Sequence, residues 1–220
     1  MPPRKAFQRL LPRWSRTDSV VAQVVLLLLM AGVTASLLYV LVWITPLSPA
    51  GGGGWMNQAT VYHPDGAPGG APGVEPARED VTVSAAETVV VTFDDPSTRE
   101  RLLLALPTLV RQVTSLAVAF LVLRIVQSLK AGDPFVPANV RRLYGIAFTV
   151  MAAALVWTAV DGTTAAALQR AALPVEGHVL FEVRLDSGAV SGLLVGFLLA
   201  ALAEVFRRGT RMRDDVEGLV

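Results

Sequence analysis

Cysteine is absent from this chain of 220 residues, and histidine occurs only twice, as His63 and His178. Without cysteine the chain can form no disulfide, no cysteine-ligated zinc or iron–sulfur site and no thiol nucleophile. The two histidines are far apart in the sequence, and neither lies in a His-Glu-x-x-His pattern. We therefore expect neither a metal ion nor a cofactor.

Sequence signatures of catalysis are missing as well. The chain contains no Gly-x-Ser-x-Gly and no Ser-x-x-Lys motif. The run Gly51–Gly54 does not predict a phosphate-binding loop, because no Lys-Ser or Lys-Thr pair follows it. The sequence therefore favours a protein that is not an enzyme.

Charged residues are scarce at 17%, whereas hydrophobic residues make up 53% of the chain. The mean hydropathy of +0.52 is too high for an ordinary soluble domain of this size and indicates a membrane protein whose first partner is the lipid bilayer. A net charge of +1 gives no sign of direct nucleic-acid binding. The preference for arginine over lysine, 17 against 2, is typical of a bacterium with a GC-rich genome.

Four apolar runs predict four transmembrane helices, because a bilayer core of about 30 Å needs roughly 20 helical residues. The clearest run contains the stretch Val24–Ala31 and has no charge. The predicted segments are a basic tail at 1–19, helices at 20–45, 102–129, 143–168 and 189–206, outer segments at 46–101 and 169–188, an inner loop at 130–142 and a tail at 207–220.

The distribution of arginine and lysine predicts the orientation, because cytoplasmic flanks retain positive charge during insertion. Basic residues cluster before the first span, between the second and third spans, and after the fourth. They are Arg4, Lys5, Arg9, Arg13, Arg16, Lys130, Arg141, Arg142, Arg207, Arg208, Arg211 and Arg213. The segment 46–101 instead holds eight acidic residues against three arginines. Both termini are therefore predicted to be cytoplasmic, in the cell membrane of a bacterium.

A cleaved signal peptide is the alternative interpretation of the amino terminus, since Ser48-Pro49-Ala50 resembles a cleavage site. However, the apolar stretch of 26 residues at 20–45 is longer than the roughly 7–15 residues typical of such signals. Cleavage would also leave an odd number of spans. A retained transmembrane helix is favoured.

The outer segments predict a small extracytoplasmic β-sheet. Residues 48–76 are rich in glycine and proline and predict a flexible linker. Strands are predicted at Val81–Ser84, at Thr88–Phe93 and, from its alternating pattern, at His178–Leu185. Because isolated strands are marginal in water, we expect them to combine into one sheet on the ends of the last three helices. Separate loops are the alternative. The fold class is thus an all-α membrane bundle of four transmembrane helices with a small sheet.

Ionisable groups inside the spans need a partner or water. Arg111 and Asp161 each lie 18 residues from the predicted inner ends of neighbouring helices, which predicts an intramembrane ion pair at equal depth. Such a pair serves either a transport site or helix orientation, and the alternative to a pair is that each group reaches outward to the membrane interface. Arg124 and Glu204 form a second candidate pair near the inner boundary, where both can reach water.

Two motifs point to a known family. Leu123–Phe135 ends in Gly-Asp-Pro-Phe and is followed by Asn139 and a basic pair, and the fourth span ends in Ala-Glu-Val-Phe-Arg-Arg-Gly. Together these resemble the bacterial membrane proteins grouped as domain of unknown function 2975, over about 102–220. The matching positions predict a cytoplasmic cluster of Arg124, Gly132, Pro134, Phe135, Asn139, Arg142, Glu204, Phe206 and Gly209.

The resemblance implies architecture and location rather than an activity. Members are often encoded beside small helix-turn-helix regulators, which hints at a regulatory pairing. Our first functional hypothesis is therefore sensing or regulation through a cytoplasmic protein that docks on this cluster. The second is a subunit of a transporter or channel that uses Arg111 and Asp161. Four helices without internal repeats would then require assembly with further copies of the chain.

Overall fold

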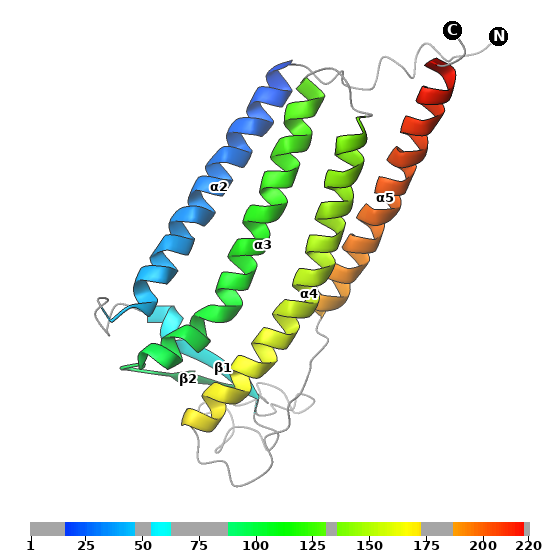
Figure 1. The fold of residues 1–220 in the computed structure, drawn as a ribbon. Coiled ribbons are helices and arrows are strands. Elements are labelled where there is room, and N and C mark those ends of the chain that lie inside the picture. The colour runs from blue at the N-terminus through cyan, green and yellow to red at the C-terminus, as the bar shows by residue number, and fades with distance from the viewer. Residues whose placement is uncertain (1–15, 47–53, 63–87, 131–135, 173–186, 218–220) are drawn as a thin grey trace, which may run out of the picture. The chain divides into compact units, whose positions relative to one another are not determined.

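Four long helices dominate the computed structural model, which describes residues 16–46, 54–62, 88–130, 136–172 and 187–217 (Figure 1). The elements are α2 (Arg16–Ile44), η2 (Gly54–Asn57), β1 (Gln58–Tyr62), β2 (Thr88–Thr92), α3 (Thr98–Lys130), α4 (Pro137–Ala172) and α5 (Ser187–Glu217). Within these ranges, four helices are long and apolar enough to cross a membrane, as the sequence predicted. Each helix begins before the span predicted from apolar residues alone.

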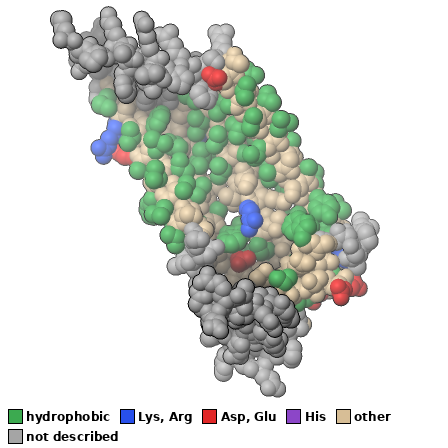
Figure 2. Space-filling view, turned by 180° about the vertical axis from the view of Figure 1, so that it is seen from behind, with side chains coloured by type: hydrophobic (Ala, Val, Ile, Leu, Met, Phe, Trp, Pro, Cys, Tyr) green, Lys and Arg blue, Asp and Glu red, His purple; other side chains and the backbone are tan. Residues whose placement is uncertain are grey.

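The surfaces of these helices are apolar where a soluble protein would be polar. Large hydrophobic side chains are exposed on every helix, including Leu28 on α2, Phe120 on α3, Phe148 on α4 and Leu198 on α5. Figure 2 shows hydrophobic side chains spread along one face of the molecule, with few charges among them. Exposed apolar surface of this extent indicates lipid contact.

The starts of α3 and α4 are set by residues outside the apolar runs. Ser97 caps α3: its backbone N–H donates to Glu100 Oε2 at 2.7 Å, and the Glu100 N–H donates to Ser97 Oγ at 3.4 Å. This reciprocal capping box begins the helix before Leu102, the predicted start. Helix α4 begins at Pro137, as its fixed φ angle predicts for a first helical position.

The sheet has two antiparallel strands, and its register pairs Gln58 with Thr92 and Tyr62 with Thr88. Strand β2 confirms the strand predicted at Thr88–Phe93. The flexible linker predicted over 48–76 is wrong for Gly54–Tyr62, which forms η2 and β1. Thr60, Val61 and Tyr62 are strong strand formers, and the surrounding glycines and prolines concealed them. The strands predicted at 81–84 and 178–185 lie outside the described residues.

The chain divides into two compact units, to which all four helices contribute. The terminal unit comprises Met1–Ala35, Val113–Ala152 and Ser191–Val220, and the sheet unit comprises Ser36–Gln112 and Ala153–Val190. In the sheet unit, Val40, Trp43, Met56 and Ala105 form a buried core. This core joins the end of α2, η2 and the first half of α3.

Close helix approach in the terminal unit depends on small residues. Gly196 of α5 is buried, and a Cβ atom placed on it would overlap Met151 Cγ and lie 3.1 Å from the Ala147 carbonyl oxygen. Gly196 is one of three glycines spaced four residues apart, Gly188, Gly192 and Gly196, a spacing that favours close helix packing. Glycine is required there because any side chain would separate α5 from α4.

Candidate functional site

A buried asparagine connects α3 with the start of α4 in the terminal unit. Asn139 is 5% exposed, and its Oδ1 accepts hydrogen bonds from Ser128 Oγ and from Arg142 Nη1, both at 2.8 Å. Because arginine can only donate, this contact identifies the amide oxygen of Asn139. Arg142 Nη1 also donates to the Arg124 carbonyl oxygen at 3.0 Å. The arrangement fixes the ends of both helices.

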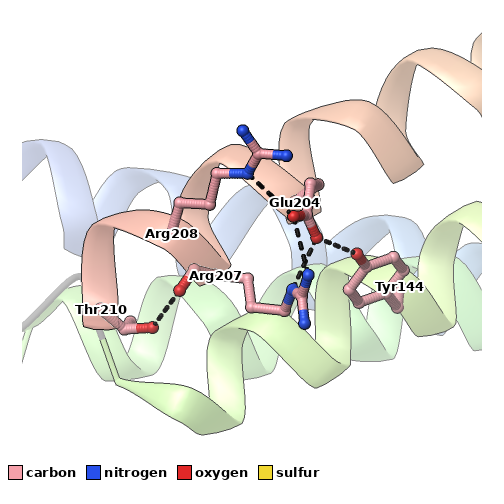
Figure 3. A network of polar contacts seen from close by, with 5 residues as sticks. All are labelled: Tyr144, Glu204, Arg207, Arg208 and Thr210. Atoms are coloured by element: carbon pink, nitrogen blue, oxygen red, sulfur yellow. Dashed lines mark hydrogen bonds and ion pairs between the residues drawn. The ribbon is translucent and has the colours of Figure 1, made fainter. Parts of the chain in front are cut away.

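A second cluster surrounds Glu204 on α5 (Figure 3). Arg207 donates to both carboxylate oxygens, from Nε at 2.6 Å and from Nη2 at 2.8 Å, and Arg208 Nε donates at 3.0 Å. The Tyr144 hydroxyl donates to Glu204 Oε2 at 3.1 Å, which connects α4 with α5. The carboxylate is thus held by a bidentate arginine, a second arginine and a phenol. We call Ser128, Asn139, Arg142, Tyr144, Glu204, Arg207 and Arg208 the polar belt.

The predicted cytoplasmic cluster is placed only in part. Asn139, Arg142 and Glu204 lie in the polar belt of the terminal unit. Phe206 and Gly209 are half-buried on α5. The remaining predicted members, Gly132, Pro134 and Phe135, lie outside the described residues.

Arg124 does not lie where the sequence suggested. Its guanidinium carbon is 5.3 Å from the centroid of the Phe120 ring, one turn earlier on α3, and its side chain is exposed. Glu204, the partner suggested for it, pairs with Arg207 and Arg208 instead. Arginines three and four residues after a glutamate are ideal helical partners for it. Arg207 and Arg208 therefore pair with Glu204 more readily than an arginine on another helix does.

Sequence reasoning missed Ser128 and Tyr144, and it counted Arg207 and Arg208 only as positive flanks. A signal for the arginines was present, because Glu204 precedes them at the helical spacing of three and four. No comparable signal marks Ser128 or Tyr144. Their role depends on which helix faces them, and the sequence does not specify that.

In the sheet unit, Arg111 packs against an aromatic ring. Its guanidinium carbon lies 5.6 Å from the centroid of the Trp157 ring on α4. The Arg111 side chain is exposed, and no hydrogen bond from it is present within the described part of the chain. Asp161 follows Trp157 by one helical turn, and its backbone carbonyl accepts a hydrogen bond from Thr164 Oγ1 at 3.1 Å. The ion pair of Arg111 with Asp161 stays a prediction.

A second arginine of the sheet unit, Arg101, was not predicted as a site residue. It is 6% exposed, and its guanidinium donates to the carbonyl oxygens of Pro96 at 3.0 Å, Trp43 at 3.2 Å and Thr45 at 3.3 Å. Its carbon also lies 5.9 Å from the centroid of the Trp43 ring. Arg101 therefore fastens the end of α2 to the beginning of α3.

Neither unit offers an evident metal site in its described part. Across the described ranges, no group of three or more His, Cys, Asp or Glu side chains could hold an ion. An apolar hollow of about 350 Å³ lies between α2 and α3 of the terminal unit and is lined mainly by Leu26, Leu29, Val118 and Val122. Thr114, Ser115 and Ala119 complete the lining of the hollow.

Comparison with known proteins gives one result. No curated protein and no solved structure matches the chain. The family described as protein of unknown function (DUF2975) matches residues 81–220, which include α3, α4, α5 and the complete polar belt. With most of its length matched, and with the motifs around Asn139 and Glu204 inside the matched region, the chain belongs to this DUF2975 family of proteins of unknown function.

Proposed function

We propose that this protein senses or regulates from the bacterial cell membrane by binding a soluble cytoplasmic protein at the polar belt of the terminal unit. One observation carries the proposal: hydrogen bonds join Asn139 and Arg142 of α4 to α3, and Glu204 of α5 to α4, within the family's matched region. Hydrogen bonds between side chains of neighbouring helices restrict the relative positions of those helices, here through Ser128 with Asn139 and Tyr144 with Glu204. The belt is therefore suited to present a defined surface.

The exposed charge of the terminal unit supports an acidic partner. Arg141, Arg208 and Arg211 are exposed in this unit, and Glu204 is half-buried. Oriented positive groups attract acidic protein surfaces and set the register of docking. Because Glu204 is already paired with two arginines, its negative charge repels an acidic partner less than an unpaired carboxylate would.

The orientation is part of the proposal. The basic flanks support an orientation with both termini and the loop at 130–142 in the cytoplasm, and β1 and β2 outside. The chain has no cysteine, so one introduced cysteine reports its own accessibility. In intact cells, a membrane-impermeant maleimide is expected to label Trp55→Cys, which is 71% exposed, and not Arg211→Cys. Labelling of Arg211→Cys alone would reverse the orientation.

Crosslinking and affinity capture from native membranes test the docking surface. The captured protein is identified, purified and tested again with purified wild type, Asn139→Ala and Glu204→Gln. Arg170→Gln is the matched control, because Arg170 is an exposed arginine of the sheet unit. We expect binding to be lost in the first two variants and retained in the control.

Glu204→Gln also separates a fixed docking surface from simple charge attraction. The substitution removes a negative charge and releases Arg207 and Arg208, so unspecific attraction of an acidic protein would increase. Loss of binding would show that the positions of the arginines matter. Stronger binding, or unchanged binding in both variants, would contradict the proposal.

A subunit of a transporter or channel is the second candidate, favoured by the exposed Arg111 within the span Thr98–Leu129. Arginine at membrane depth often marks a substrate path. Four spans would then assemble with further copies of the chain. Ion flux into proteoliposomes should decrease in Asp161→Asn if this is correct, and equal flux in wild type and variant would remove it.

A further inference from the structure

Arg111 lies where an unpaired charge is expensive. It follows Leu102, the start of the apolar run, by nine positions, or about 14 Å of helix. Its neighbours on α3 include Leu109 and Val110, and the whole segment belongs to a candidate span. In such surroundings a guanidinium needs an anionic or carbonyl oxygen within reach.

The contact with Trp157 leaves the donors of Arg111 available. The guanidinium carbon lies 5.6 Å from the ring centroid, a cation–π contact that uses none of the five N–H donors in a hydrogen bond. The Arg111 side chain is exposed and makes no hydrogen bond within the described ranges. The Trp157 Nε1 atom is a further donor nearby, buried and likewise without an acceptor there.

Arg101, in this same unit, shows which acceptors an arginine beside a tryptophan uses. It lies over Trp43 at a similar distance and donates to three backbone carbonyl oxygens. Within the described ranges, Arg111 has the aromatic partner without the oxygens. A ligand that brings its own oxygens would satisfy these donors, and the apolar surroundings favour a ligand over water.

We propose that Arg111 and Trp157 form a binding site for the phosphate group of a phospholipid. The guanidinium fork matches two phosphate oxygens, and the indole holds the fork in one orientation. Leu155 and Val156, immediately before Trp157, are 54% and 48% exposed and offer apolar surface to an acyl chain. A soluble anion would not use that surface.

The charge of Asp161 also selects the ligand. This residue lies one turn beyond Trp157 on α4, and residues four positions apart share a helix face. A carboxylate repels a dianion about twice as strongly as a monoanion. The singly charged phosphodiester of a phospholipid is therefore preferred over inorganic phosphate, which is partly dianionic at neutral pH.

Native mass spectrometry of the full chain, purified in a neutral detergent, tests the site. Phosphatidylglycerol is titrated into wild type, Arg111→Gln, Arg111→Lys and Arg170→Gln, and diacylglycerol serves as the phosphate-free lipid. We expect Arg111→Gln to bind phosphatidylglycerol about tenfold more weakly, the effect of losing hydrogen bonds to a charged group. The affinity of Arg111→Lys for phosphatidylglycerol should lie between those of wild type and Arg111→Gln, and the affinity of Arg170→Gln should equal that of wild type.

Two further measurements test the tryptophan and distinguish a phospholipid from free phosphate. Trp157→Leu should weaken lipid binding by about threefold through loss of the cation–π contact. Circular dichroism and gel filtration establish that each variant is folded. Equal affinity of Arg111→Gln and wild type, or equal binding of diacylglycerol, would overturn the proposal. Displacement of the lipid by millimolar inorganic phosphate would assign the site to free phosphate instead.

Discussion

Two arginines of α3, Arg101 and Arg111, lie over tryptophans of the sheet unit, and they differ in everything else. Arg101 is buried and donates to carbonyl oxygens from two other segments of the chain. Arg111 is exposed, and its described contact is the Trp157 ring. The aromatic contact is common to both and so does not determine their roles. The oxygen acceptors do: with them an arginine fastens the chain, and without them it is available to a ligand.

The comparison predicts its largest effect at Arg101. Replacing Arg101 with Gln leaves the carbonyl oxygens of Trp43 and Thr45 without their donor and opens space beside the Trp43 ring. The free energy of unfolding should fall by about 3 kcal/mol, within the range for breaking a buried polar network. Thermal unfolding in a neutral detergent, followed by circular dichroism, measures this. Stability within about 0.5 kcal/mol of wild type would show that Arg101 fastens nothing.

A smaller effect is expected at Ser97, which caps the helix turn that carries Arg101. Ser97→Ala removes the side-chain half of the capping box with Glu100. Loss of a helix cap costs about 1 kcal/mol. In the Arg101→Gln background, Ser97→Ala should cost less stability, because the cap then no longer positions the Arg101 side chain against α2. If the losses of stability in the double variant are strictly additive, the Ser97 cap and the Arg101 hydrogen bonds act independently.

The sequence was sufficient for the helices because lipid-facing segments need long apolar runs. It was less informative at their ends. The α3 start depends on Ser97 and Glu100, which are polar residues before the apolar run, and β1 depends on five residues between glycine-rich segments. The capping residues and the five-residue strand are short, local signals. The long apolar runs that predict membrane spans give no information about either of them.

The candidate sites were harder to predict because charge has several uses. Asn139, Arg142 and Glu204 were predicted from their motifs, and the polar belt contains all three. Arg207 and Arg208 had been assigned to orientation, and Arg101 to the outer flank. Each also has a specific partner in space, which counting positive residues cannot reveal. The partner Tyr144 depends on the packing of α4 with α5.

The next effect concerns the two aromatic contacts themselves. A double-mutant cycle of Arg111→Gln and Trp157→Leu should give a coupling energy of about 0.5–1 kcal/mol, the usual value for an exposed cation–π pair. The corresponding cycle of Arg101→Gln and Trp43→Leu should give more, because that pair is desolvated. Thermal unfolding of the four variants and of both double variants provides the energies. Equal coupling in both cycles would mean that burial does not distinguish the two arginines.

The smallest effect is expected at Arg111. In neutral detergent without phospholipid, Arg111→Gln should lower the free energy of unfolding by about 0.5 kcal/mol, the lower end of the range for losing an exposed cation–π contact. With phosphatidylglycerol present, wild type should gain stability by mass action and the variant should gain less. A large loss of stability without lipid would mean that Arg111, like Arg101, holds segments of the chain together. An equal gain in both proteins would place the lipid elsewhere, because only binding at Arg111 makes the stabilisation depend on that guanidinium.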